Sequence, residues 1–96
     1  IVLCAKGYPD NYIKDREIKN INKVKIDKNN QIFHAGTYHK DNRIFSSGGR
    51  VLNITSKASK LKVARDKSIE NLKKISWIDG FFRKDIGWRV IKNENN

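Results

Sequence analysis

The sequence Arg50-Val51-Leu52-Asn53-Ile54-Thr55 has the alternation of a strand, with Leu52 and Ile54 directed to one face. The other face would carry Val51, Asn53 and Thr55. After this strand, small and apolar residues recur every three or four positions, as they do along one side of a helix: Leu61, Ala64, Ser68, Leu72 and Ile75. A strand followed by one amphipathic helix predicts an α+β domain in which the helix packs on a small antiparallel sheet.

The ends of this helix carry recognisable signals. Ser59 is the expected N-cap, because its hydroxyl can accept hydrogen bonds from the free N–H groups of the first turn. Glu70 and Lys74 form an i,i+4 pair in the favourable order. Lys73 and Lys74 lie near the negative end of the helix dipole. We therefore expect a helix of roughly four to five turns from Ser59 onward.

Further strands are expected on both sides of these two elements. Before them we expect strands at residues 1–6, near Glu17–Ile21, at Ile32–Tyr38 and at Arg43–Ser46. The last two should form a hairpin through the turn at His39–Asn42, whose residues tolerate turn geometry.

Turns and ends are also predicted. Lys28-Asn29-Asn30 has the composition of an exposed turn. After the helix, the apolar runs at Phe81-Phe82 and at Trp88–Ile91 predict short strands. The final residues, 92–96, should form a frayed tail.

Length and composition limit the range of possible functions. The chain has 96 residues, enough for one small domain and too few for the catalytic body of a large enzyme. It contains no Met and opens on Ile1–Ala5, so we expect it to be the excised end of a longer protein. The opening apolar run is too short to cross a bilayer and lacks a basic leader, which favours a cytoplasmic protein. Cys4 is the single cysteine, and we expect a buried, unreactive thiol.

The formal net charge of +11 has three interpretations. A free-standing module that binds RNA or DNA would be basic, but the lysines here are scattered rather than gathered into one block. The abundance of Lys, Asn and Ile together favours a compositional origin. A positive field could also attract phosphorylated substrates to a nearby active site.

Four motifs together point to a known family. In chain order they are Lys6-Gly7-Tyr8-Pro9, Phe33-His34-Ala35-Gly36-Thr37, Gly48-Gly49-Arg50-Val51-Leu52 and Phe81-Phe82-Arg83-Lys84-Asp85-Ile86-Gly87-Trp88-Arg89. In these runs and in their order the chain closely resembles the C-terminal domain of phosphoribosylamine–glycine ligase, an ATP-grasp enzyme of purine synthesis. The family usually continues the first motif with Gly and Ser, whereas Asp10 and Asn11 follow here.

This resemblance implies a fold and a reaction. Residues 1–96 would be a single C-terminal domain with the barrel-like half-hybrid motif that follows the ATP-grasp core. The full enzyme would use ATP to phosphorylate the glycine carboxylate, and the amine of 5-phosphoribosylamine would then displace phosphate. Mg²⁺ would bridge the phosphates through ligands in the upstream domains. The implied partners are these substrates and domains, with no specific nucleic acid and no membrane.

The best site candidate is Gly48-Gly49-Arg50. Two glycines allow close backbone approach and can direct successive N–H groups at an anion. An Arg adds a planar fork for carboxylate or phosphate, the groups carried by the implied substrates. The alternative is that the glycines only interrupt the chain at the start of a strand and that the Arg side chain lies in solvent.

Arg83, Lys84 and Asp85 form the second candidate. Asp85 could orient a cation toward phosphates, or the group could be a structural ion pair that fixes the last strand. A further alternative therefore stays open, in which the whole domain is a purely structural cap that contacts no ligand.

Other residues carry weaker signals. His34, on a strand, is expected to be hydrogen-bonded in the core, and His39 to be solvated in the turn. Their spacing does not match a metal site, and no phosphate-binding loop of the Walker type is present. The aromatic residues are expected to serve in core and interdomain packing rather than in base stacking: Trp77, Phe81, Phe82 and Trp88.

Overall fold

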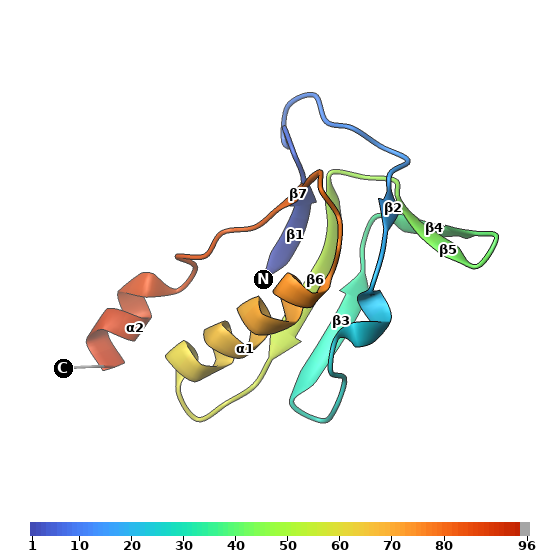
Figure 1. Ribbon diagram of the computed structural model, residues 1–96. Helices are drawn as coiled ribbons and strands as arrows, with labels where there is room; N and C mark the ends of the chain where they lie inside the picture. Colours follow the sequence, from blue (N-terminus) through green and yellow to red (C-terminus); the bar gives the residue numbers. More distant parts are fainter. Residues whose placement is uncertain (95–96) are drawn as a thin grey trace.

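A computed structural model describes residues 1–94, which form two antiparallel sheets and two α-helices (Figure 1). The four-stranded sheet has the order β3 (Asn30–His34), β6 (Arg50–Ser56), β1 (Val2–Ala5) and β7 (Gly80–Phe81). The three-stranded sheet has the order β2 (Glu17–Ile18), β5 (Arg43–Ser46) and β4 (Thr37–Lys40). The helical elements are the 3₁₀ turn η1 (Ile21–Lys23), α1 (Leu61–Lys74) and α2 (Trp88–Glu94). The predicted α+β class is confirmed.

The core lies between α1 and one face of the four-stranded sheet. In β6, Leu52 and Ile54 are fully buried, as predicted, and Leu72 of α1 packs in the same cluster. Val51 was placed on the opposite face and is also fully buried. The reason is an irregularity in the β1–β6 register, where Leu3 pairs with Leu52 but Cys4 pairs with Arg50. This bulge makes Val51 an extra residue in β6 and interrupts the alternation.

The strand predicted at Ile32–Tyr38 is two strands in two different sheets. It breaks between β3 and β4 at Ala35 and Gly36, whose backbone N–H groups both donate to the carbonyl of Val51. A Cβ on Gly36 would lie 2.6 Å from the carbonyl oxygen of Arg50, so glycine allows the two backbones to pass. The break carries the β4–β5 hairpin away from the main sheet (Figure 1).

The predicted hairpin itself is confirmed as β4–β5. Its turn residues Asp41 and Asn42 have φ values of 53° and 61°. Positive φ at two consecutive central residues is the pattern of the hairpin turn that matches strand twist. Tyr38 stacks on Phe45 across the hairpin and donates a hydrogen bond of 2.9 Å to Asp15.

The turn expected at Lys28-Asn29-Asn30 is shorter than predicted. Asn30 is buried and begins β3. Its side chain donates to Asp27 at 3.0 Å and accepts from Ser56 at 2.9 Å. These hydrogen bonds satisfy the amide away from water, which explains how a polar residue can occupy a core position.

Helix α1 begins later than predicted, and Ser59 is not its N-cap. The N-cap position is Lys60, which makes no side-chain cap hydrogen bond. Of the predicted apolar stripe, Ser68 and Leu72 are buried, whereas Leu61 is partly exposed. Lys73 and Lys74 occupy the last turn, as predicted.

The end of the chain contains a second helix where a strand was predicted, so the expectation of a single helix is wrong. Gly87 has a φ of 75°, and the N–H of Trp88 donates to the carbonyl of Asp85, which turns the chain into α2. Ile91 anchors this helix, being only 7% exposed. Residues 92–94 belong to α2, and residues 95–96 lie outside the described part, so the frayed tail expected at residues 92–96 stays a prediction. The short strand expected at Phe81 is present as β7.

Candidate functional site

The loop Gly48-Gly49-Arg50 lines a pocket of about 400 Å³ on the four-stranded sheet. The loop connects β5 to β6, so it passes from one sheet to the other. The bend between β3 and β4 and the loop after β1 supply the other walls. The pocket is lined by Val2, Tyr8, Ala35, Gly36, Gly48, Gly49, Arg50 and Asn53.

Glycine at position 49 is required by the ring of Tyr8. A Cβ there would lie 2.0 Å from Cδ2 of that ring. The carbonyl of Gly49 accepts a hydrogen bond of 2.7 Å from Ala5. Within residues 1–94, neither Gly48 nor Gly49 donates its backbone N–H to a protein acceptor. Both donors are therefore available to an anionic group in the pocket.

The side chain of Arg50 is exposed, and no carboxylate of residues 1–94 lies within salt-bridge distance of it. Its backbone pairs with Cys4, and its charge lowers the pKa of that thiol, although burial has the larger effect and raises the pKa overall. Cys4 is half-buried rather than fully buried as predicted. A guanidinium without a protein partner remains free to bind a carboxylate or a phosphate.

The second candidate group is exposed and already paired. Arg83 donates to Asp85 through Nε at 3.3 Å and Nη2 at 3.1 Å, and the two side chains are 70% and 58% exposed. The hydrogen bond and charge of Arg83 lower the pKa of Asp85, and Asp85 raises the pKa of Arg83. Lys84 is exposed. Because the pair lies within one loop, it orients Arg83 and does not tie the loop to the rest of the fold.

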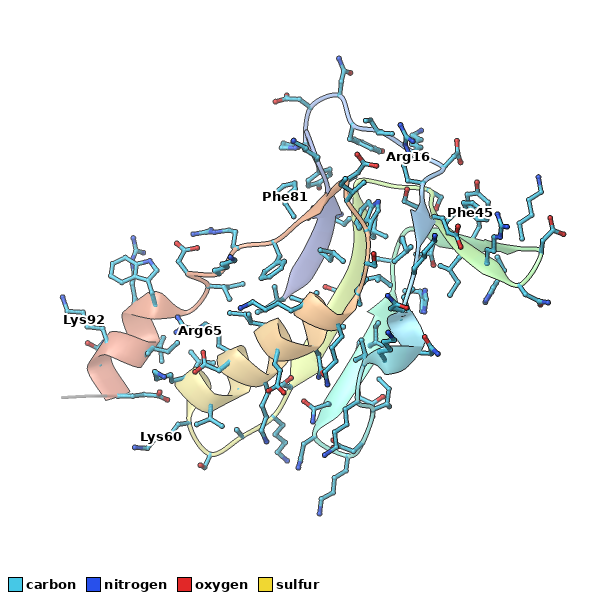
Figure 2. All side chains as sticks on the ribbon, in the orientation of Figure 1. Arg16, Phe45, Lys60, Arg65, Phe81 and Lys92 are labelled. Carbon is cyan, nitrogen blue, oxygen red and sulfur yellow. The ribbon has the colours of Figure 1, made fainter. Side chains whose placement is uncertain are left out.

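The two candidate groups flank one region of the sheet. Arg83 lines a second pocket of about 330 Å³ with Ile1, Val2, Cys4, Tyr8, Phe81, Phe82 and Ile86. Val2 and Tyr8 line this pocket and also the pocket at Arg50, so the two hollows adjoin. Figure 2 shows Phe81 beside β1 in this region. Sequence reasoning did not assign Tyr8 to the site, although the motif Lys6-Gly7-Tyr8-Pro9 contained it.

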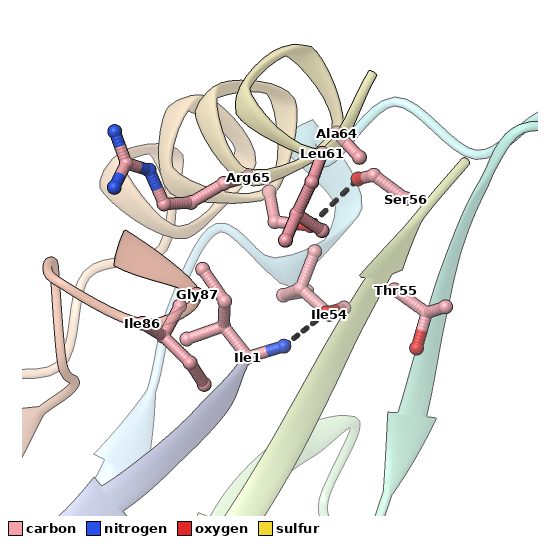
Figure 3. Close-up of a pocket in the computed structure, with 10 residues that line it drawn as sticks. Ile1, Ile54, Thr55, Ser56, Leu61, Ala64, Arg65, Ile86 and Gly87 are labelled. Carbon is pink, nitrogen blue, oxygen red and sulfur yellow. Dashed lines mark hydrogen bonds between the residues drawn. The ribbon is translucent and has the colours of Figure 1, made fainter. Parts of the chain in front are cut away.

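A third pocket, of about 220 Å³, lies on the α1 side (Figure 3). Strand β6, helix α1 and residues 86–87 surround it, and Ile1, Ile54 and Leu61 are among its apolar walls. Ser68 donates to Ser56 at 2.7 Å, which satisfies the hydroxyl there. This pocket has the character of a gap in packing between the helix and the sheet.

The histidines do not form a site. His34 is exposed, contrary to the prediction of a core position, and its Nδ1 lies 2.8 Å from Oγ1 of Thr37. His39 is exposed on β4. Within residues 1–94, no three His, Cys, Asp or Glu side chains are close enough to share a metal ion. None of the helices in this part of the chain combines the length and apolar composition needed to cross a bilayer.

Comparison with known proteins identifies the family. The family model described as "Phosphoribosylglycinamide synthetase, C domain" matches residues 1–89. The chain belongs to this family. A phosphoribosylamine–glycine ligase of Brucella melitensis is 45% identical over 98% of the chain and 22% of its own length. For the chloroplastic ligase of Arabidopsis thaliana, the identity is 36%, over 98% of the chain and 18% of that protein.

A solved structure agrees with this assignment. The crystal structure of phosphoribosylamine–glycine ligase from Thermotoga maritima matches with a TM-score of 0.70 and 32% identity, over 88% of the chain and 20% of that protein. This phosphoribosylglycinamide synthetase C domain thus spans about a fifth of the length of the relatives that it matches. The resemblance inferred from the four motifs is confirmed.

Proposed function

We propose that this chain is the C-terminal domain of a longer, cytoplasmic ligase that joins glycine to 5-phosphoribosylamine, with ATP converted to ADP and phosphate. The membership of residues 1–89 in the C-domain family supports this proposal, as does the high coverage of the chain by its relatives. Glycinamide ribonucleotide would be the product, in purine biosynthesis.

In this proposal the domain closes one side of the active-site cleft. It binds substrate and supplies no group that takes part in the chemical step. Arg50 and the backbone N–H groups of Gly48 and Gly49 would hold a substrate carboxylate or phosphate. The single observation that carries this role is that all three line one pocket and lack acceptors among residues 1–94. Arg83, oriented by Asp85, and Lys84 would add positive charge at the neighbouring pocket. A closed wall also excludes water, which would otherwise hydrolyse an acyl phosphate.

The residues of this chain do not fit Mg²⁺. Magnesium prefers oxygen ligands, usually carboxylates together with substrate phosphates. Within the described residues no cluster of carboxylates is present, and Asp85 is already bound to Arg83. The ligands for Mg²⁺ and for ATP therefore belong, in this proposal, to upstream domains.

An assay of the parent protein, the longer ligase that would contain this chain, tests this function. The parent should convert ATP to ADP only when both glycine and phosphoribosylamine are present, and should release glycinamide ribonucleotide. ATP turnover that is independent of either substrate would contradict the proposal, as would tight, sequence-selective binding of RNA or DNA by this chain.

A further inference from the structure

A polar pocket of about 190 Å³ lies between helix α1 and residues 25–30, which lead into β3. None of its residues lines the pocket at Arg50. Its helical residues are spaced three or four positions apart, so they share one side of α1. We call it the α1–loop pocket, and it is lined by Lys25, Asp27, Asn29, Asn30, Lys67, Glu70, Asn71 and Lys74.

Asn71 is the fixed polar group of this pocket, being only 4% exposed. Its Oδ1 accepts from the backbone N–H of Lys25 at 3.4 Å and from Nζ of Lys74 at 3.3 Å. Because both partners are donors, they fix the orientation of the amide, and Nδ2 points away from them. Within residues 1–94, Nδ2 donates to no protein acceptor. The fully enclosed side-chain atoms without a partner in this part of the chain are Arg65 Nε and Trp77 Nε1, so Nδ2 of Asn71 is open to the pocket.

Three lysines surround this donor with positive charge. Within the described residues, the ammonium groups of Lys25, Lys67 and Lys74 have no carboxylate at salt-bridge distance. Lys67 and Lys74 are half-buried, which keeps their stems beside the pocket. The negative end of the α1 dipole would disfavour an anion here, but Lys73 and Lys74 in the last turn offset it.

The two carboxylates of the pocket do not cancel this charge. Oδ1 of Asp27 already accepts from the backbone N–H of Asn29 at 2.8 Å and from the side chain of Asn30 at 3.0 Å. These hydrogen bonds satisfy that oxygen and hold the residues 27–30 turn in place. Glu70 is exposed and can turn toward water. The groups left without partners are therefore mainly donors and cations.

We propose that the α1–loop pocket binds the phosphate group of a small phosphorylated molecule. Nδ2 of Asn71 donates to one phosphate oxygen, and the ammonium groups of Lys67 and Lys74 bind the others. A volume of about 190 Å³ is below the range of about 300–1,000 Å³ found for drug-sized ligands. It suits one phosphate group with a short carbon chain and is too small for a nucleotide. This site goes beyond the proposed ligase function and does not rest on it.

Protection of the pocket lysines from acetylation tests the proposal in the parent protein at constant ionic strength. Inorganic phosphate should slow the acetylation of Lys67 and Lys74, measured by mass spectrometry of their peptides, with half of the effect on the order of 1 mM. Lys60, exposed at the other end of α1, should not be slowed. Glycerol 3-phosphate identifies the source of the phosphate group. Tighter protection than by phosphate assigns an ester, whose hydroxyls can donate to Asp27, and equal protection assigns free phosphate.

Asn71→Asp is the sharpest variant, because it keeps the shape and the Oδ1 acceptor but replaces the donor with a carboxylate oxygen. It should raise the half-protecting phosphate concentration at least about tenfold. Lys67→Gln, read at Lys74, should raise it about threefold or more, and it replaces Asn71→Asp if that variant has a lower thermal unfolding midpoint. Lys60→Gln removes the same charge elsewhere on α1 and should change it by less than about twofold.

Three results would overturn the proposal. The first is acetylation of Lys67 and Lys74 that is unchanged at about 20 mM phosphate. The second is equal slowing at Lys60, which would mean non-specific ion binding. The third is wild-type protection in both Asn71→Asp and Lys67→Gln. None of these results depends on ligase activity, so each would leave the proposed function untouched.

Discussion

Glu94 in α2 accepts a hydrogen bond of 2.8 Å from the backbone N–H of Leu61 at the start of α1. The other carboxylate oxygen accepts from the N–H of Lys62 at 3.3 Å. A carboxylate at a helix N-terminus satisfies orphan donors and complements the helix dipole. Thus the last described residue caps a helix that lacks a side-chain cap of its own.

Removal of this cap should destabilise the chain. We expect Glu94→Ala to cost about 1 kcal/mol. For a chain of this size, that loss lowers the thermal unfolding midpoint by about 4–8 °C. Glu94→Gln should cost less, because it keeps an acceptor oxygen. The control is Asn93→Ala at the neighbouring exposed position. Equal midpoints for wild type and Glu94→Ala, measured by circular dichroism, would show that the cap contributes nothing.

The two loop glycines should respond very differently to alanine. Gly49→Ala would place Cβ against the ring of Tyr8, and overpacking of this kind costs about 1–3 kcal/mol. At Gly48 the nearest atom would lie 3.6 Å away, an ordinary contact, so Gly48→Ala should change stability by less than about 0.5 kcal/mol. Urea denaturation of both variants gives the comparison. Combining Gly49→Ala with Tyr8→Ala should relieve the clash.

Arg50→Ala in the parent ligase should lower kcat/KM far more than stability. Loss of a charge-assisted contact to a carboxylate or phosphate should cost roughly 2–4 kcal/mol, on the order of a hundredfold in kcat/KM. Arg50→Lys should restore only part of this, because an ammonium cannot make the planar double contact. Arg43→Ala, at an exposed Arg on the other sheet, is the control.

Steady-state rates with glycine and phosphoribosylamine varied separately would show which substrate Arg50 contacts. Near wild-type rates for both Arg50 variants would mean that Arg50 is a surface residue. The site assigned to this loop would then be wrong.

The pKa of Asp85 should rise when its partner is removed. In the native chain, the hydrogen bond and charge of Arg83 hold this pKa below its usual value. A carboxyl group with a lowered folded pKa stabilises the fold above its unfolded pKa of about 3.9 and loses this contribution as pH falls through the folded pKa. Arg83→Gln should therefore raise the pKa of Asp85, as followed by NMR titration of its side-chain carboxyl carbon. An unchanged titration would show that the pair does not persist in solution.

The chain alone should not bind Mg-ATP with useful affinity. It has no Walker-type loop, and no carboxylate cluster is present in the described residues. Calorimetric titration should give no binding heat beyond dilution. A micromolar dissociation constant would contradict the assignment of the ATP ligands to upstream domains.

Much of the fold could be predicted from local patterns. Alternation identified β6 and the buried Leu52 and Ile54, and the turn residues Asp41 and Asn42 predicted the β4–β5 hairpin. These features depend on side-chain periodicity and backbone preferences within a few residues. The four motifs also identified the family, because they kept their order along the chain.

Tertiary contacts decided the remaining features. Ser59 satisfied the local rule for an N-cap, but the carboxylate of Glu94 from a distant helix satisfies the free N–H groups of α1. Val51 is buried because a bulge against β1 interrupts the alternation, and the pattern of one strand cannot reveal its partner's register. Likewise, the sequence marked Gly48-Gly49-Arg50 as a candidate site. Only the fold placed Tyr8 against Gly49, because contacts between distant segments depend on how the whole chain packs.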